Sequence, residues 1–488
     1  MTGKTNEQHE QARTEGSDTA NDARRRTFQR LCSDYEEYFD SISDLLEELV
    51  PHVEQLDGSA QEVSRLFGSS NVDFSNNDRL AIATFFRDNL TRTVSLREMI
   101  NILFDKHFDT AWGQFLINAL HKHVTYSPKL PILTNSLITS IIGGFEVALA
   151  KTTTEYYRAS PNALLATPKD RQKEFSLQDL KQLGSIEEAV EAAIASRVDD
   201  LLFGSLAGWR RFYKDKMNID FSELSIDWAT TDEIFQRRHI IVHNGGRAST
   251  RYINSTGRTD ITKDELIASD DRYVRMALDH LFVLGYLVTA AAWEKFTDSP
   301  GESCDDVQRM GYVLLTRRRW QAAKRISSFG VDHATDSLTA HMCQVNAWIA
   351  EKGMKGLGSI EKAVRAWDVS ALSKDFQLAK YCLLDDLDKA FDMLPPMLEA
   401  NTIGGESLLE WPLLEGVRAD ARFLSLKEYV KRTLDDEVQH VYQLPGGHVY
   451  HLPSCQRRGA GAERVVMTAA VDSGARPCKS CHPKEKAA

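Results

Sequence analysis

Apolar residues recur at helical spacing along most of the chain. Between Phe28 and Leu49 they occupy positions 28, 31, 35, 38, 42, 45 and 49, in alternating steps of three and four. This heptad-like seam predicts a helix that ends at Pro51, because proline cannot donate the next helical hydrogen bond. We expect the helix to dock on the rest of the chain. Pairing with a second copy is the alternative, since three heptads are about the minimum for a coiled coil.

The helical spacing continues in stretches that are separated by helix breakers. It stays near 3.6 from Asp78 to His123 and stops before Ser127-Pro128. A second stretch runs from Leu130 to Phe296, and Asp298-Ser299-Pro300-Gly301 then predicts a boundary. Short helical patterns follow as far as Val430. We therefore predict an all-α, multi-domain protein.

The C-terminal part has a different character. After Asp435 the segment HVYQLPGGHVYHLPSC is β-prone and is punctuated by Gly and Pro. The predicted organisation is a disordered segment 1–25, a helical N-terminal region 26–127, a helical bundle 128–299, a region of helical hairpins 300–434 and a small Cys/His module 435–488.

Composition and the N-terminal residues indicate the cellular location that we expect for the protein. Of 488 residues, 42% are apolar, and we find no stretch as long as a membrane span, which needs roughly 18–20 apolar residues. The nearest, Leu281–Trp293, is flanked by charges and predicts a buried helix. The first 25 residues lack the apolar core of a signal peptide, and the seven cysteines are an odd number. We expect a cytoplasmic protein without a membrane partner.

The net charge of −11 argues against a general nucleic-acid binder, because phosphate contacts need concentrated Lys and Arg. It does not exclude an enzyme that engages a few nucleotides. Two basic runs exist, and the simpler interpretation of both is a solvated helix face: Arg210, Arg211, Lys214 and Lys216, and Arg317, Arg318, Arg319, Lys324 and Arg325.

The segment QRRHIIVHNGG, residues 236–246, carries the best candidate chemistry. It places Arg238 and His239 on helical stripes that also hold Ile234, Phe235, Ile241 and Val242. Asn244-Gly245-Gly246 is a helix-stop signal, so His243 is expected in the last turn. There the helix dipole favours the protonated imidazole by roughly 0.3–1 kcal/mol. A group that titrates near neutral pH suits general acid–base catalysis.

These residues resemble the signature of the HEPN superfamily, an arginine and a histidine separated by a gap of four to six positions. Arg238 and His243 match with a gap of four, and Arg237 would give a gap of five. A long helix before the motif, glycines after it and an apolar helix at the end extend the resemblance over about residues 130–297. The bundle 128–299 is accordingly expected to have the HEPN fold.

The resemblance implies a metal-independent endoribonuclease acting as a homodimer on RNA. His243 would exchange a proton with the ribose 2′-hydroxyl or the leaving 5′-oxygen, and Arg238 would bind the scissile phosphate, giving a 2′,3′-cyclic phosphate. His239 and Asn244 would orient this pair, Arg237 would add phosphate binding, and Glu146 is a supporting candidate. By analogy with the family, the protein would be a toxin or an antiviral defence effector.

Other interpretations of the motif stay open. Arg237 follows Glu233 by four residues and could form only a surface ion pair. His239 and His243, also four apart, could bind a metal in a metallohydrolase, although no third ligand is evident nearby. The chain could also be a non-catalytic dimeric scaffold that binds protein and nucleic acid.

The region 306–430 resembles degenerate tetratricopeptide-type repeats, and an irregular helical bundle is the alternative. Ala322-Ala323 and Ala390-Phe391 would allow close helix packing, with Trp320, Trp348 and Trp367 filling the spaces between helices. This region is where we expect a protein partner to bind.

Four residues of the C-terminal module have the spacing of zinc ligands. Three residues separate His451 from Cys455, two separate Cys478 from Cys481, and 22 lie between the halves. A closed Cys3His set predicts a structural Zn²⁺ that folds a segment poor in apolar residues, with no metal required for catalysis. His448 or His482 could replace His451. A redox-active Cys478–Cys481 pair and a metal-free tail are the alternatives.

Overall fold

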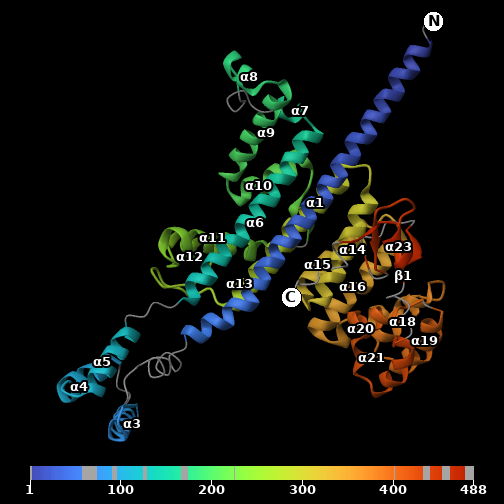
Figure 1. Ribbon diagram of the computed structural model, residues 1–488. Coiled ribbons are helices and arrows are strands. Elements are labelled where there is room, and N and C mark those ends of the chain that lie inside the picture. The colour runs from blue at the N-terminus through green and yellow to red at the C-terminus, as the bar shows by residue number, and fades with distance from the viewer. Residues whose placement is uncertain are drawn as a thin grey trace.

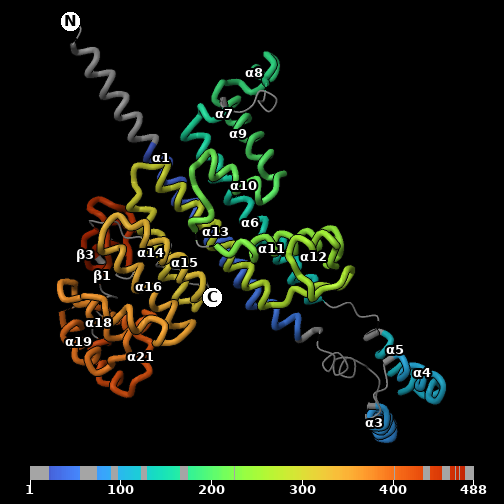
Figure 2. Tube along the Cα trace, turned by 180° about the vertical axis from the view of Figure 1, so that it is seen from behind, coloured from blue at the N-terminus to red at the C-terminus, as the bar shows by residue number. Residues whose placement is uncertain are grey.

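The computed structural model describes residues 3–57, 74–90, 96–124, 129–165, 174–224, 226–400, 402–431, 440–452, 455 and 462–478. The described chain is mostly helical, as predicted, and has a small sheet near its C-terminus. Three long helices lie side by side at its centre (Figure 1 and Figure 2): α1 (Gly3–Asp57), α6 (Leu130–Ala159) and α13 (Asp271–Phe296).

Helix α1 docks on α6 and α13 through a stripe that differs from the predicted one. The buried positions are 28, 32, 35, 39, 42, 46 and 50. Of the predicted seam, Tyr38, Leu45 and Leu49 are 41%, 44% and 37% exposed. Both stripes begin at Phe28 and advance in steps of three and four residues, so spacing alone could not distinguish them. Docking on the chain itself, the favoured alternative, is what the structure has.

Both predicted ends of this first helix are wrong. The helix continues through Pro51 to Asp57, because Leu46 and Val50 are buried in the turn before the proline and hold the helix against its neighbours. At the other end it begins at Gly3, inside the segment 1–25 that was expected to be disordered. Further along the helix, Arg25 forms an ion pair of 2.6 Å with Glu302.

The predicted N-terminal region 26–127 is divided in the structure. Helix α1 belongs to the main core, whereas the next three helices share a separate core around Phe85, Leu103 and Trp112. These helices are α3 (Asn76–Leu90), α4 (Leu96–His107) and α5 (Ala111–Val124).

Between α6 and α13 the chain forms shorter elements that frame the candidate site. They are α7 (Asn162–Leu165), α8 (Leu177–Leu183), α9 (Ile186–Leu202), α10 (Leu206–Phe212), the π-helix η2 (Tyr213–Met217), the 3-10 helix η3 (Phe221–Leu224), α11 (Trp228–Asn244) and α12 (Thr250–Thr256). Helix α11 packs on α6, with Phe145 and Phe235 in ring contact at 6.0 Å.

The helical hairpins follow the predicted breaker, with α14 beginning at Pro300, but they do not form a separate core. Apolar residues on both sides of the breaker, such as Leu287 and Leu314, belong to one continuous cluster. The elements are α14 (Pro300–Thr316), α15 (Trp320–His333), α16 (Ser337–Lys355), η4 (Leu357–Ser359), α17 (Glu361–Ala366), α18 (Lys374–Leu383), α19 (Leu387–Glu399), α20 (Gly405–Glu410), η5 (Pro412–Leu414), α21 (Glu415–Ala419) and η6 (Ala421–Leu426).

Two of the central helices are long and apolar enough to cross a membrane by length and composition, which sequence analysis did not anticipate. The apolar window of α13 is 83% buried inside the protein and that of α6 is 44% buried. Leu281, Leu284 and Leu287 are fully buried, as a core helix requires, and Leu281–Trp293 was expected to be one.

The C-terminal module contains the sheet that its sequence predicted. Its strands are β1 (His440–Gln443), β2 (Val449–His451), β3 (Glu463–Val466) and β4 (Arg476–Pro477), with α23 (Met467–Asp472) before β4. The strand order is β3-β1-β2-β4, antiparallel except for the parallel pair β2 and β4. Val441, Tyr450, Ala470 and Ala475 form a small core of its own.

Candidate functional site

Helix α11 carries the arginine–histidine motif and has well-defined ends. Asp227 caps its start by accepting the backbone N–H groups of Ala229 and Thr230. Gly245 ends it in the left-handed conformation, with φ of 59°, as the stop signal predicted. His243 therefore lies in the last turn and is exposed to solvent, and Asn244 is the exposed final residue.

The buried face of α11 consists of Thr231, Ile234, Arg237 and Ile240, so it includes Arg237 in place of the predicted Arg238. Val242, which was placed on an apolar stripe, is 50% exposed. Arg238 and His239 are half-buried at the edge of this face. Two adjacent arginines thus have different surroundings.

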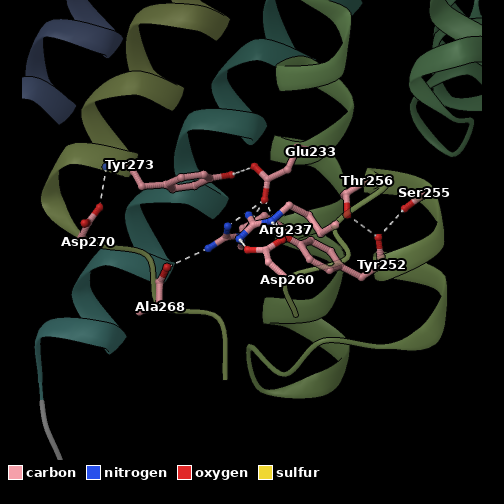
Figure 3. A network of polar contacts seen from close by, with 10 residues as sticks. Glu233, Arg237, Tyr252, Ser255, Thr256, Asp260, Ala268, Asp270 and Tyr273 are labelled. Atoms are coloured by element: carbon pink, nitrogen blue, oxygen red, sulfur yellow. Dashed lines mark hydrogen bonds and ion pairs between the residues drawn. The ribbon is translucent and has the colours of Figure 1, made fainter. Parts of the chain in front are cut away.

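Arg237 is enclosed in a network of the protein's own polar groups (Figure 3). It is 4% exposed, and it donates to Glu233 at 3.0 Å and to the carbonyl oxygen of Ala268 at 2.8 Å. Tyr252 and Tyr273 donate their hydroxyls to the same Glu233, and the guanidinium lies 4.3 Å from the ring centroid of Tyr273. The expected pair with Glu233 is present, but it is buried. Arg237 has no exposed donor for a phosphate, so its predicted phosphate-binding role does not fit the structure.

Arg238 has no such partners. Its Nε is buried without a hydrogen-bond partner, and no carboxylate in the described part of the chain forms an ion pair with it. Glu146 of α6 interacts with it electrostatically. Burial raises the pKa of Glu146, and the Arg238 charge opposes that rise. A guanidinium that lacks an internal partner retains its capacity to bind an external anion.

The two histidines of the motif lie together at the end of α11. Their ring centroids are 4.7 Å apart. Burial lowers the pKa of His239, and the neighbouring His243, Arg251 and Arg238 lower it further. His239 is thus held neutral near pH 7, where it can accept a proton or a hydrogen bond.

Sequence analysis missed Arg251, which α12 brings to this surface. Ser249 caps α12 by accepting the backbone N–H of Tyr252, and the buried Tyr252 ring packs α12 against α11. Arg251, next to Tyr252, is exposed and acts on His239 electrostatically. The sequence signal for it was Ser249-Thr250-Arg251, a helix start that lies shortly after Gly245-Gly246.

In the described residues, the grouping of side chains that could hold a metal is in the C-terminal module and leaves out His239 and His243. The parallel pairing of β2 with β4 joins Tyr450 to Pro477, so His451 and Cys478 each come directly after this pair. His451 Nδ1 is 3.2 Å from the Cys455 sulfur, which is 3.9 Å from the Cys478 sulfur. One imidazole and two thiols at this separation can converge on one metal ion. Cys481 and His482 lie outside the described residues, and His448 is exposed and not part of the group.

The cations of the basic run 317–325 contact other groups of the protein. Each of its cations has a partner: Asp40 for Arg317, Glu415 for Arg318, Asp279 for Arg319, Glu351 for Lys324 and His280 for Arg325. In the other run, Arg210 stacks on Trp228 and Lys214 pairs with Asp220. The run 317–325 therefore leaves little free charge for nucleic acid, whereas the exposed Arg211 and Lys216 of the other run form no ion pair among the described residues.

Comparison with known proteins gives no relative for this arrangement. No family model matches the chain, and neither does a curated protein or a solved structure. Any function must be inferred from the site itself.

Proposed function

We propose that the chain is a metal-independent endoribonuclease of HEPN type. The observation that carries the proposal is the half-buried Arg238 without an internal partner, beside two histidines in contact at an exposed helix end. Arg251 adds a second cation to the same surface. This set can bind one phosphodiester and exchange protons with it.

The proposed reaction is attack of a ribose 2′-oxygen on the adjacent phosphorus. A neutral imidazole takes the 2′-hydroxyl proton as the new O–P bond forms, and a protonated imidazole gives a proton to the 5′-oxygen as its bond to phosphorus breaks. The products are a 2′,3′-cyclic phosphate and a 5′-hydroxyl. His243, at the exposed end, is the proposed acid–base group, and Arg238 stabilises the charge on the phosphoryl oxygens. His239 and Asn244 orient them.

The proposal includes a homodimer in which two copies of the motif share one cleft. The exposed Val242 beside His243 supports a partner surface there, because an apolar side chain gains from being covered. By analogy with the family, we further propose that the substrate is RNA and that the protein acts as a toxin or antiviral defence effector. The proposed location is the cytoplasm, without a membrane partner.

Cleavage of a labelled RNA pool in EDTA tests the proposal. Wild type is expected to cleave it and to leave ends that a cyclic phosphodiesterase opens. His243→Ala should reduce the rate roughly 10²–10⁴-fold, the usual contribution of a general acid or base. His52→Ala, an exposed histidine of α1, is the matched control. Equal rates for wild type and His243→Ala would remove the catalytic assignment and favour a non-catalytic scaffold.

We further propose that His451, Cys455 and Cys478, with Cys481 as fourth ligand, hold a structural Zn²⁺. The convergence of the first three supports the site. Elemental analysis is expected to give about one zinc per chain, lost in Cys478→Ser, while RNA cleavage in EDTA continues. The control variant Cys343→Ser, which replaces a buried cysteine outside the C-terminal module, should keep the zinc. No zinc in wild type, or zinc retained in Cys478→Ser, would exclude this ligand set.

A further inference from the structure

Helix α1 has a second apolar stripe, which stays at the surface after the first has docked. Leu31, Tyr38 and Leu45 recur every two turns of the helix, and Leu49 extends the stripe by one more turn. Tyr38, Leu45 and Leu49 are exposed, and Leu31 is half-buried. Single exposed leucines are common on protein surfaces, whereas a stripe with heptad spacing is typical of a helix that packs against another helix.

A small cavity lies between this stripe and α6. Its volume is about 180 Å³, and Leu31, Tyr38, Gly143 and Val147 line it. Helices α1 and α6 run side by side here (Figure 1), with the Tyr38 hydroxyl donating to the carbonyl oxygen of Ser140. Val147 is exposed, and a Cβ atom on Gly143 would meet no other atom within 4 Å, so the cavity opens toward solvent. Such a hole between two helices accepts an apolar side chain from a third.

The two ends of the stripe carry opposite charges. Arg30 lies beside Leu31, and Glu48 lies between Leu45 and Leu49. Arg30 and Glu48 are about five helical turns apart, so they lie on the same side of α1. Both are exposed, and neither forms an ion pair among the described residues. The stripe therefore has a free cation at one end and a free carboxylate at the other.

This pattern is complementary to itself when a second α1 runs in the opposite direction. The midpoint of positions 31 and 45 is 38, and that of positions 30 and 48 is 39, so one two-fold axis near Tyr38 serves both matches. The axis brings Leu45 of each copy to the cavity beside Leu31 of the other, and Arg30 of each to Glu48 of the other. A parallel pair would place each charge beside its own kind, which is unfavourable.

We propose that two copies of the chain associate through α1 in antiparallel orientation, with each Leu45 filling the cavity between α1 and α6 of the other copy. This contact is separate from the cleft proposed on α11. Helix α11 reaches α6 through Phe145, which lies on the opposite side of α6 from Gly143 and Val147, because positions two apart on a helix differ by about 200°. The inference does not depend on RNA cleavage.

Sedimentation equilibrium of the full chain tests the contact. Wild type is expected to self-associate, and Leu45→Asp should weaken this association roughly tenfold or more, because it puts an unpaired charge into the apolar contact twice per dimer. Leu45 is exposed in the single chain, so the variant should fold, as thermal unfolding would confirm. Leu424→Asp, at an exposed leucine of η6, is the control. A wild-type chain that stays single, or equal weakening by both variants, would overturn the proposal.

Charge reversal tests the antiparallel orientation. Arg30→Glu and Glu48→Arg should each weaken the association roughly tenfold, because each sets like charges beside one another. The combined variant restores both ion pairs with their signs exchanged, and it should recover most of the wild-type affinity. No weakening by the single variants, or no recovery in the combined one, would overturn the proposal.

Disulfide cross-linking tests the register. Leu31→Cys/Leu45→Cys should form a covalent dimer when diamide oxidises the thiols, because positions 31 and 45 meet across the axis but are about 21 Å apart along one helix. Leu31→Cys and Leu45→Cys alone are the controls and should form none. A covalent dimer from Leu45→Cys alone would show a parallel pair and overturn the proposal. No dimer from the double variant, as when copies meet only at α11, would overturn it and leave the RNA proposal intact.

Discussion

Two regions of this chain that contain adjacent arginines differ in how the fold surrounds those cations. The run 317–325 looks in sequence like a nucleic-acid patch, yet each of its cations has a partner in the protein. The end of α11 has fewer cations, and there Arg238 lacks an ion pair among the described residues. The number of arginines is therefore a poor guide to a binding site.

The difference lies in which carboxylates the fold brings within reach. Helix α1 places Asp40 beside Arg317, across more than 270 residues of chain. Within the motif itself, Glu233 is one turn before Arg237 and pairs with it. Arg238, one residue later, forms no ion pair with that glutamate or with Glu146. A shift of one position separates a structural arginine from an available one.

The largest expected effect comes from breaking the structural side of this comparison. Glu233→Ala leaves Arg237 buried and unpaired and removes the acceptor of two tyrosine hydroxyls. It should lower the free energy of unfolding by about 3–5 kcal/mol, measured by urea denaturation. Asp232→Ala, at the exposed neighbouring position, should change it by about 0.5 kcal/mol or less. A loss from Glu233→Ala no larger than that of the control would contradict the role of the network.

The next effect sharpens the contrast between the two arginine regions. Arg238→Ala should reduce RNA cleavage about 10²–10³-fold, as loss of an oxyanion-stabilising donor does, with little change in unfolding. Arg317→Ala, which removes a half-exposed partner of Asp40, should cost only about 0.2–1 kcal/mol of stability and leave cleavage unchanged. Initial rates on a fluorescent RNA measure both. If the Arg317 variant lost more cleavage than the Arg238 variant, the assignment would be reversed.

The last effect concerns the contacts of Arg325. It donates to Nδ1 of His280, whose Nε2 lies 2.7 Å from the Thr231 hydroxyl, and burial with the Arg325 charge lowers the His280 pKa to about 4. At His280 the folded chain therefore binds fewer protons than the unfolded chain between about pH 6.5 and 4. Stability should fall by an amount on the order of 3 kcal/mol as pH drops through this interval.

Comparison with His280→Gln isolates this contribution from that of the carboxylates. The variant should lack the His280 part of the decline in urea-unfolding free energy between pH 6.5 and 4. Identical pH profiles for the two proteins would refute a neutral buried imidazole at this position.

The sequence predicted much of the local structure and less of the packing. Caps and breakers worked well: the end of α11 at Gly245, the start of α14 at Pro300 and the β-prone module were all found, because each depends on a few adjacent residues. The docking face of α1 and the passage of its helix through Pro51 were missed. Both depend on what α6 and α13 present to α1, which local spacing does not record.

The candidate site divides in the same way. Spacing placed His239 and His243 on one end of a helix, and the ring contact follows from that. It could not decide which of Arg237 and Arg238 would be buried, because Tyr252, Ala268 and Tyr273 come from segments that follow α11. Arg251 was missed for the same reason, because it reaches this surface only through the packing of α12 against α11.

The apolar core that runs unbroken across Pro300 has a consequence for dissecting the molecule. Because α13 and α14 bury side chains in the same cluster and α1 is tied to both, a cut at the breaker would expose a hydrophobic cross-section on each fragment. The bundle and the first hairpins should therefore melt together as one cooperative unit, whereas α3–α5, with their own core, are free to unfold independently.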